Sequence, residues 1–493
     1  MNLAELLDAT SARWPGRPAV TDVRSGRALT YAELAGEAER VAGFLRARGV
    51  RPGQRIGLLA PNALAYVPAA FGLLRTGACL VPVAESLTPS EVAEILSRVE
   101  VNGCLAWPRA ASRSASDDAA VLAGGVCEGF QFRWIDRDAA GAAGLERLNP
   151  AFIRFSSGTT AASKGVVLSH EATAARVVAA DRLLRFSEDD RVLWVLPLAY
   201  HFAVTIVAYV RAGAHILLCP DSLPGTVIDA IRRQRATVFY ASPLHFQRLA
   251  GLPSTGPLTS LRLALSTSAP IARAVMEQFE SAHGVPVAQA YGIIEAGLPC
   301  INIPADGLPS TSVGRAVPGY EVAVLGDTGA TMPAGAAGEV ALRGDGLFSA
   351  YYAPWQVREQ VVRDGWFLTG DVGRLDGSGA LQLEGRKKAV IFAAGLKFFP
   401  EEVEACINAF PGIRESRVHG HPHARLGEVP RAQIVLDSPA VDLDALLAHC
   451  ARELSSYKVP VEFTVVAAIP KTPGGKILRR PPPAPARLPV ERA

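Results

Sequence analysis

The chain has 493 residues, of which 49% are hydrophobic and 20% are charged, and its formal net charge at pH 7 is +3. This length exceeds what one hydrophobic core usually supports, so two or more domains are expected. The near-balanced charge gives no reason to expect a nucleic acid or an anionic membrane surface as a partner.

Cysteine usage and apolar windows favour a cytoplasmic protein without a membrane span. An odd set of seven cysteines is dispersed along the chain without a CxxC pair, which favours reduced thiols over a disulfide framework. Residues 1–10 lack the basic segment of a signal peptide. The most apolar window, 201–219, is interrupted by Arg211 and Gly213 and is therefore expected to be a helix followed by a strand.

The first hundred residues alternate short apolar segments with amphipathic helices. Thr30 and Glu33 match a capping box, and apolar residues then recur at helical spacing. A second capping box at 88–91 opens another helix, and apolar segments at 55–60 and 79–83 are expected to be strands. This alternation predicts parallel sheets covered by helices on both faces.

Residues 152–169, FIRFSSGTTAASKGVVLS, form the most informative segment. Two apolar stretches flank a loop of glycine and hydroxylated residues that ends in Lys164, and Ser169 stands where a helix N-cap is expected. Glycine lets the backbone approach a ligand closely, and a nest of backbone N–H groups attracts negative charge. The segment therefore favours a strand–loop–strand unit that binds a polyphosphate.

Two alternatives stand beside this interpretation of the loop. A plain Ser/Thr/Gly surface loop has the same composition. The P-loop pattern of Gly, four residues and Gly-Lys-Ser/Thr is not met, because Lys164 precedes the second Gly. A phosphate-binding loop of another family therefore fits better than a kinase or GTPase.

Beyond this loop the pattern changes. Segments 192–197, 216–219 and 237–241 are expected to be buried strands, and 200–210 a helix. From 314 to 346 turns are frequent and strands are short, which predicts a small antiparallel barrel or hairpin layer.

A compact second part begins near Arg386. Its pattern predicts a strand at 389–392, a helix from Pro400, and strands at 414–419 and 432–436. The Pro-rich C-terminal tail cannot pack a core. The Ala/Ser-rich stretch between the first strands and the phosphate loop, 107–120, is expected to be a surface excursion.

Four motifs together resemble those of the adenylate-forming (ANL) superfamily, which includes acyl-CoA synthetases, adenylation domains of peptide synthetases and luciferases. They are SSGTTAASKG at 156–165, YGIIE at 291–295, WFLTGD at 366–371 and PGGKI at 473–477. Each motif alone is a common turn or surface sequence, but their combination is specific to adenylation.

The resemblance implies an α/β fold in two domains. Residues 1–387 would form a large N-terminal domain of parallel sheets covered by helices, with a small β-barrel layer. Residues 388–481 would form a small mobile α+β domain that carries the catalytic lysine. Residues 482–493, the Pro-rich tail, are expected to be disordered.

The resemblance also implies a binding site for ATP and Mg²⁺. The phosphate cradle would be formed by the amide, hydroxyl and ammonium groups of Ser156, Ser157, Gly158, Thr159, Thr160 and Lys164. Glu295 would bind Mg²⁺, because this hard ion prefers carboxylate oxygen. The chain departs from the family pattern at Ala161 for a Gly, Ser163 for a Pro, and Ile294 for the Thr that normally faces the phosphate.

Adenine and ribose would contact a second group of residues, namely Ser268, Ala269, Pro270, Tyr291, Gly292, Asp371 and Arg386. A carboxylate such as that of Asp371 is the simplest acceptor for two ribose hydroxyls. In the second domain, Lys388 would be the hinge and Gly395 would let a pantetheine arm pass. Lys476 would be the catalytic cation that bridges the substrate carboxylate and the α-phosphate as charge develops.

The acyl pocket would be lined by His201, Phe202, Ala203, Ile206 and Tyr240, with His201 also counted among the catalytic groups. Amino-acid-activating relatives carry an Asp in this segment, whereas no Asp or Glu occurs here between residues 193 and 219. A hydrophobic or aryl carboxylic acid is therefore implied.

These features predict an AMP-forming acid–thiol ligase that activates a carboxylic acid with ATP and transfers the acyl group to CoA. One alternative acceptor is the phosphopantetheine of a free-standing acyl carrier protein. Another alternative is a nucleotide-binding homologue with impaired chemistry, motivated by the three departures. The histidines at 419, 421 and 423 allow a metal cluster, but no Cys or further His stands near them in the sequence.

Overall fold

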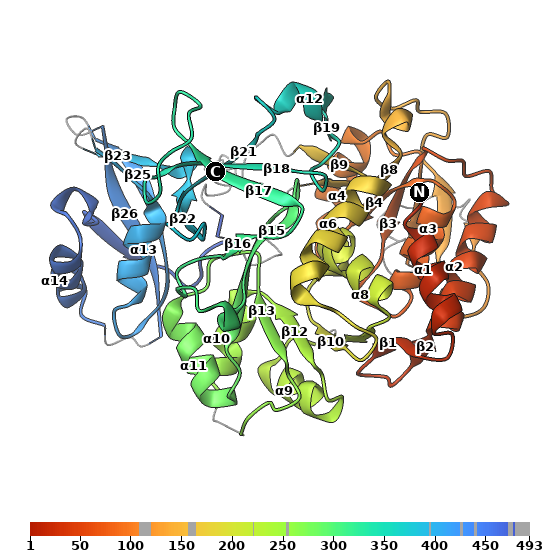
Figure 1. The fold of residues 1–493 in the computed structure, drawn as a ribbon, viewed down its shortest axis with the longest axis horizontal. Helices are drawn as coiled ribbons and strands as arrows, with labels where there is room; N and C mark the ends of the chain where they lie inside the picture. The colour runs from red at the N-terminus through yellow and green to blue at the C-terminus, as the bar shows by residue number, and fades with distance from the viewer. Residues whose placement is uncertain are drawn as a thin grey trace, which may run out of the picture.

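The computed structural model describes residues 1–107, 120–155, 164–219, 221–252, 256–393, 396–423, 427–437, 441–471 and 477–478. Over these residues the elements form layers of sheet and helix, with the N-terminal and C-terminal elements at opposite ends (Figure 1). The expected α/β fold class is confirmed. Most of the expected surface excursion and all of the Pro-rich tail lie outside the described residues.

One mixed sheet is built mainly from the first 170 residues. Its strands run in the order β20 (Gln356–Val357), β19 (Ala350–Tyr352), β9 (Gly165–Ser169), β8 (Pro150–Phe155), β4 (Cys79–Val83), β3 (Arg55–Leu59), β5 (Gly103–Ala106), β7 (Gln131–Trp134) and β6 (Ala120–Val121). Strands β8, β4, β3 and β5 are parallel neighbours. Strand β9 turns back antiparallel to β8, with Phe155 opposite Gly165, so the phosphate loop connects a hairpin.

A second mixed sheet carries two of the segments predicted to contact adenine and ribose, 268–270 and 291–292. Its order is β16 (Arg315–Ala316), β15 (Gly297–Asn302), β14 (Val287–Ile293), β13 (Leu263–Ser266), β12 (Val238–Ala241), β10 (Arg191–Trp194), β11 (His215–Leu218), β1 (Pro18–Asp22) and β2 (Ala28–Thr30). The strands from β1 to β14 are parallel and both edges are antiparallel. Parallel strands end at the same sheet edge, which is where ligands bind in such sheets.

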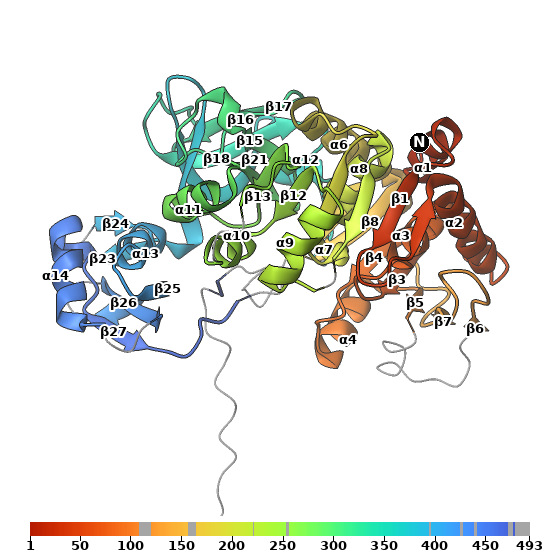
Figure 2. The same ribbon diagram turned by 90° about the horizontal axis from the view of Figure 1, so that it is seen from below.

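Helices cover these two sheets (Figure 2). They are α1 (Ala4–Arg13), α2 (Tyr31–Arg46), α3 (Tyr66–Arg75), α4 (Pro89–Arg98), η2 (Leu145–Leu148), α6 (His170–Leu184), α7 (Leu198–His201), η3 (Phe202–Ile206), α8 (Val207–Ala212), α9 (Pro224–Arg233), α10 (Pro243–Ala250), α11 (Arg273–His283), η4 (Pro304–Asp306) and α12 (Arg358–Val361). Both capping boxes and the Ser169 N-cap are confirmed. The helix expected over 200–210 starts at Leu198 and contains a π-helical turn, η3. Such turns are frequent at functional sites.

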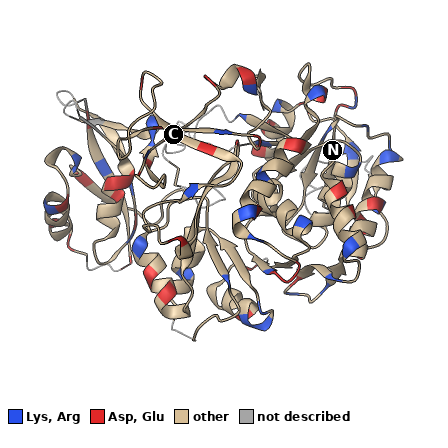
Figure 3. Ribbon diagram, viewed as in Figure 1, with Lys and Arg blue, Asp and Glu red and all other residues tan. Residues whose placement is uncertain are grey.

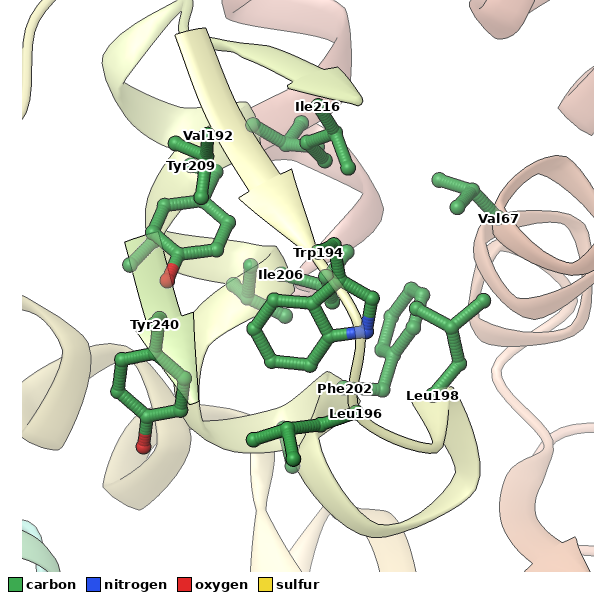
Figure 4. Close-up of a cluster of buried hydrophobic side chains, with 14 of the residues drawn as sticks. Val67, Val192, Trp194, Leu196, Leu198, Phe202, Ile206, Tyr209, Ile216 and Tyr240 are labelled. Atoms are coloured by element: carbon green, nitrogen blue, oxygen red, sulfur yellow. The ribbon is translucent and has the colours of Figure 1, made fainter. Parts of the chain in front are cut away.

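The main core joins the two sheets. Helix α3 is apolar on all sides, and almost every one of its residues is buried, as expected of a helix enclosed by other elements. Part of this core, with Val67 of α3 and Trp194 of β10, is shown in Figure 4. The shared core fixes the two sheets relative to each other and so fixes the loops at their edges.

The predicted antiparallel layer is present as a small sheet of β17 (Tyr320–Leu325), β18 (Gly338–Gly344), β21 (Phe367–Leu375) and β22 (Leu381–Arg386). Each neighbouring pair is antiparallel. A short turn joins β21 to β22, whereas β19, β20 and α12 lie between β18 and β21 in the chain.

The C-terminal elements form a separate group with its own core, which includes Val403, Ile407, Ile434 and Leu446. Its elements are η5 (Lys387–Ala389), β23 (Ile391–Ala393), β24 (Leu396–Phe398), α13 (Pro400–Asn408), β25 (Ile413–His423), β26 (Gly427–Leu436), α14 (Leu443–Glu453), η6 (Ser456–Lys458) and β27 (Glu462–Val465). The strand expected at 389–392 begins later, because a 3₁₀ turn first leads the chain away from β22. The strands expected at 414–419 and 432–436 are parts of one long hairpin.

Charged side chains of both signs are scattered over the helices (Figure 3). This mixture agrees with the small formal net charge of +3. Among the described residues, no helix combines the length and the apolar character that a bilayer crossing requires.

Candidate active site

Tyr351 contacts both Lys164 and Glu295. Lys164 stands exposed before β9, with its Nζ 4.4 Å from the centroid of the Tyr351 ring. The hydroxyl of Tyr351 donates a hydrogen bond of 3.1 Å to Oε1 of Glu295. Strand β19 pairs with β9, Tyr351 opposite Val166, and this pairing brings the tyrosine beside the phosphate loop. Burial, and then the charge of Glu295, raise the pKa of Tyr351, so its hydroxyl remains a donor.

Arg176 of α6 holds the turn that carries Glu295. Its guanidinium donates to the carbonyl oxygens of Ile294 at 2.9 Å, Glu295 at 3.1 Å and Gly346 at 3.0 Å. The side chain is buried, and these bonds satisfy its donors inside the protein. Arg176 therefore fixes the backbone of the turn before β15, while the side chains of Ile294 and Glu295 remain partly exposed.

The hairpin of β14 and β15, which contains this turn, also carries Tyr291 of the predicted nucleotide site. The hydroxyl of Tyr291 donates a hydrogen bond of 2.6 Å to Oδ2 of Asp371, and Nε of Arg386 lies 2.8 Å from Oδ1. Asp371 and Arg386 are opposite each other in β21 and β22. Asp371 is buried, whereas 58% of the Arg386 side chain is exposed. A carboxylate has about four acceptor sites, so Asp371 retains capacity for two further donors such as ribose hydroxyls.

Burial, followed by the charge of Asp371, raises the pKa of Tyr291 well above its ordinary value. The phenol therefore stays protonated and positions the carboxylate.

Close packing explains why glycine stands at position 292. A side chain there would approach the carbonyl oxygen of Gly297 to 2.9 Å. The tight β14–β15 hairpin thus requires glycine at the second position of the motif.

The residues predicted to bind adenine follow β13 at the edge shared with β12 and β14. Ser268 has a positive φ of 76°, an uncommon backbone conformation for a residue other than glycine. Ala269 and Pro270 come next before α11. The parallel pairing of β13 and β14 places this turn beside the strand that carries Tyr291.

The predicted acyl-pocket residues gather around Trp194, at the end of β10. The ring of Tyr240 stacks on Trp194 at 5.5 Å, and the ring of His201 lies 5.6 Å from Trp194 and 6.0 Å from Tyr240. Phe202 and Ile206 belong to the same cluster (Figure 4). Phe202, Ala203, Ile206 and Tyr240 are buried, so this side of the site is aromatic and apolar.

Some of the predicted residues lie outside the described residues. These are Ser156, Ser157, Gly158, Thr159, Thr160, Gly395 and Lys476. Lys388 lies in η5, which begins directly after Arg386, the β22 residue that contacts Asp371. The described members form one connected series, from Lys164 through Tyr351 and Glu295, then along the β14–β15 hairpin to Tyr291, Asp371 and Arg386.

Sequence reasoning missed Tyr351, Arg176 and Trp194. Each stands in an apolar or helical segment without a motif of its own, so no local signal distinguishes it. Among the described residues, no three His, Cys, Asp or Glu groups are placed to hold a metal, the histidines of β25 included.

The fold and these contacts define an adenylate-forming enzyme, and comparison with known proteins agrees. Residues 7–352 match the family model "AMP-binding enzyme" and residues 402–476 match "AMP-binding enzyme C-terminal domain". The chain belongs to this family, and the predicted superfamily is confirmed.

Curated relatives extend over nearly the full chain. A feruloyl-CoA synthase from Amycolatopsis sp is 31% identical, over 94% of this chain and 97% of that protein. An indoleacetate–CoA ligase from Aromatoleum aromaticum is also 31% identical, over 97% of this chain and 96% of that protein.

Solved structures give the same result for the fold. ATP-bound MatB from Rhodopseudomonas palustris has a TM-score of 0.84 at 27% identity, covering 97% of this chain and 98% of that one. The anthranilate CoA ligase AuaEII in complex with anthranoyl-AMP has a TM-score of 0.84 at 25% identity, covering 97% of this chain and 96% of that one.

Proposed function

We propose that this protein is an AMP-forming acid–thiol ligase that converts a hydrophobic or aryl carboxylic acid to its acyl-adenylate and then to its CoA thioester. The observation that carries the proposal is the connected series from Lys164 to Arg386. It joins the predicted phosphate, metal and ribose groups from five separate segments of the chain. The names of the relatives, which are CoA ligases, support the thiol step.

In the first half-reaction, a carboxylate oxygen attacks the α-phosphorus of ATP. The bond from this phosphorus to the bridging oxygen breaks, and pyrophosphate leaves with the electron pair. Lys164 and the loop before it would hold the β- and γ-phosphates, and Lys476 would stabilise the charge that develops at the α-phosphate. Asp371 would accept hydrogen bonds from the ribose hydroxyls, while Tyr291 and Arg386 keep its carboxylate in place.

Glu295 suits the Mg²⁺ that accompanies ATP. Mg²⁺ in nucleotide sites usually takes one or two carboxylates together with phosphate oxygens, not an all-protein cage. Glu295 is a single, partly exposed carboxylate with Oε1 fixed by Tyr351, whose ring Lys164 also approaches. When bound, the ion offsets phosphate charge, and Arg176 keeps the turn beneath Glu295 in position.

In the second half-reaction, a thiol sulfur attacks the carbonyl carbon of the acyl-adenylate, its proton passes to solvent, and AMP leaves with the electron pair of the broken C–O bond. We assign residues 1–387 and 388–481 to two domains that pivot at Lys388 and present Gly395 to the pantetheine arm. The separate apolar core of the C-terminal elements supports this division.

Exchange of labelled pyrophosphate into ATP, measured across a panel of carboxylic acids, tests the adenylation step. Acid-dependent exchange is expected, and Lys476→Ala should abolish it while ATP binding and thermal stability stay unchanged. Exchange in that variant at the wild-type rate would refute the role of Lys476. ATP binding without exchange for any acid would identify a nucleotide-binding homologue instead.

The acceptor is tested separately. One activated acid is incubated with ATP and either CoA or a phosphopantetheinylated carrier protein, and the thioester is identified by mass spectrometry. Acyl-CoA is the expected product. Thioester on the carrier alone would move the protein to the carrier-loading class.

A further inference from the structure

Arg154 is a buried cation at the acyl side of the site. It is the penultimate residue of β8, only 5% of the residue is exposed, and its Nη2 donates to the carbonyl oxygen of Tyr200, the residue before His201. Its Nη1 is buried without a hydrogen-bond partner among the residues that the structure describes. A buried charged group with an unpaired donor destabilises the folded protein. Its presence here points to a ligand that accepts the missing hydrogen bond.

A second unpaired group lies in the same aromatic cluster around Phe202. The hydroxyl of Tyr66, in the first turn of α3, is also buried without a partner in the described part of the chain. Burial raises the pKa of this phenol, and the charge of Arg154 lowers it in part. The Tyr66 ring lies 6.0 Å from the ring of Phe202, one of the predicted acyl-pocket residues.

The direction of β8 places Arg154 on this aromatic side. Side chains two residues apart on a strand share a face. The ring of Phe152, two residues earlier, lies 6.2 Å from that of Phe202, so Arg154 belongs to the face that packs toward α3 and α7. Burial, followed by the charge of Arg176, lowers the pKa of Arg154 to about 10, while Tyr66, Tyr200 and Glu295 act in the opposite direction.

On the basis of the proposed function, we propose that Arg154 and Tyr66 determine acid specificity by binding an additional oxygen acceptor, anionic for preference, carried on the apolar body of the carboxylic acid. The body packs on the Trp194 and Tyr240 rings, and the acceptor receives hydrogen bonds from Nη1 of Arg154 and the hydroxyl of Tyr66. An unsubstituted acid leaves both donors unpaired and is disfavoured, because a site built for a polar group discriminates strongly against an analogue that lacks it.

Pyrophosphate exchange with matched acids tests this assignment. The probes are benzoate and phenylacetate, each compared with its ring-hydroxylated and ring-carboxylated derivatives. For the wild type, kcat/KM for the best substituted acid should exceed that for its parent by about 100-fold. Arg154→Met, of similar length without charge, should remove most of this preference, because it lowers kcat/KM for the substituted acid much more than kcat/KM for the parent acid.

Two further, more conservative variants allow the assignment to be tested even if Arg154→Met does not fold. Arg154→Lys retains the charge without the planar fork and should keep part of the preference, whereas Tyr66→Phe should reduce it by about tenfold. Thermal unfolding reports whether each variant folds.

Three results would overturn the proposal. The first is a wild type that activates acids without preferring any substituted one. The second is an equal loss for parent and substituted acids in Arg154→Met, which would assign the guanidinium to the nucleotide or to the reacting carboxylate. The third, no exchange with any acid, would overturn the proposed function and this inference together.

Discussion

The hydroxyl of Tyr351 is a sensitive point of the site, because it joins Glu295 to the strand that flanks the phosphate loop. Tyr351→Phe removes only the 3.1 Å hydrogen bond to Glu295 and keeps the ring that Lys164 approaches at 4.4 Å. A hydrogen bond to a charged group contributes about 1.5–3 kcal/mol, and the low end applies because Glu295 is partly exposed. A loss of about 1.5 kcal/mol corresponds to about a tenfold lower kcat/KM.

Pyrophosphate exchange measured at several Mg²⁺ concentrations provides the assay. Tyr351→Phe should lower the exchange rate and shift the half-saturating Mg²⁺ concentration upward, because Glu295 loses the donor that fixes its carboxylate. Tyr351→Leu also removes the ring beside Lys164. Its exchange rate should therefore be lower than that of Tyr351→Phe, and its KM for ATP should be higher than that of the wild type.

The neighbouring residue offers a matched control. Tyr352 points to the opposite face of β19, where its hydroxyl donates a hydrogen bond of 3.0 Å to Oε2 of Glu100. Tyr352→Phe deletes the same type of bond away from the site, together with the 3.2 Å hydrogen bond that the Ala142 N–H donates to this hydroxyl, and should leave exchange and Mg²⁺ dependence unchanged. An equal loss in both variants, or wild-type Mg²⁺ dependence in Tyr351→Phe, would refute the reasoning.

Other residues allow further tests. Asp371→Asn should lower kcat/KM for ATP by about 10- to 100-fold and affect 2′-deoxy-ATP less, since part of the lost binding is to the ribose hydroxyl; equal losses for both nucleotides in exchange assays would contradict this. Ile294→Thr should preserve or raise exchange activity, and a large loss would mean that this pocket is built differently from that of the family. Burial lowers the pKa of His170 to about 4, and its Nδ1 accepts a 3.0 Å hydrogen bond from the backbone N–H of Leu3. The unfolded chain therefore binds more protons than the folded protein between about pH 6.5 and 4, so the free energy of unfolding should fall as pH drops through this window, by up to about 3 kcal/mol. Urea denaturation at pH 7.5 and 5.0 should show a smaller fall for His170→Gln, and an unchanged fall would exclude the contribution.

Local patterns were sufficient for most of the secondary structure. The capping boxes at Thr30 and Thr88 start helices as expected, since an N-cap depends on residues three positions apart. Prediction was less accurate where the conformation of a segment depends on packing against other elements. The 200–210 helix acquired a π-turn, and the strand expected at 389–392 was displaced by a 3₁₀ turn.

The sequence alone determined the family, and it predicted the site residues Lys164, Glu295, Tyr291 and Asp371, because each lies in a short motif with a specific order of neighbouring residues. Only the tertiary structure decided which groups complete them. Tyr351 reaches Glu295 from 56 residues away, and Arg176 reaches the same turn from 118 and 119 residues away. Arg154 was also invisible in the sequence, since a single arginine in an apolar strand gives no sign of what lies opposite it. Such contacts depend on how sheets and helices pack, and packing is a property of the whole core and not of any one segment.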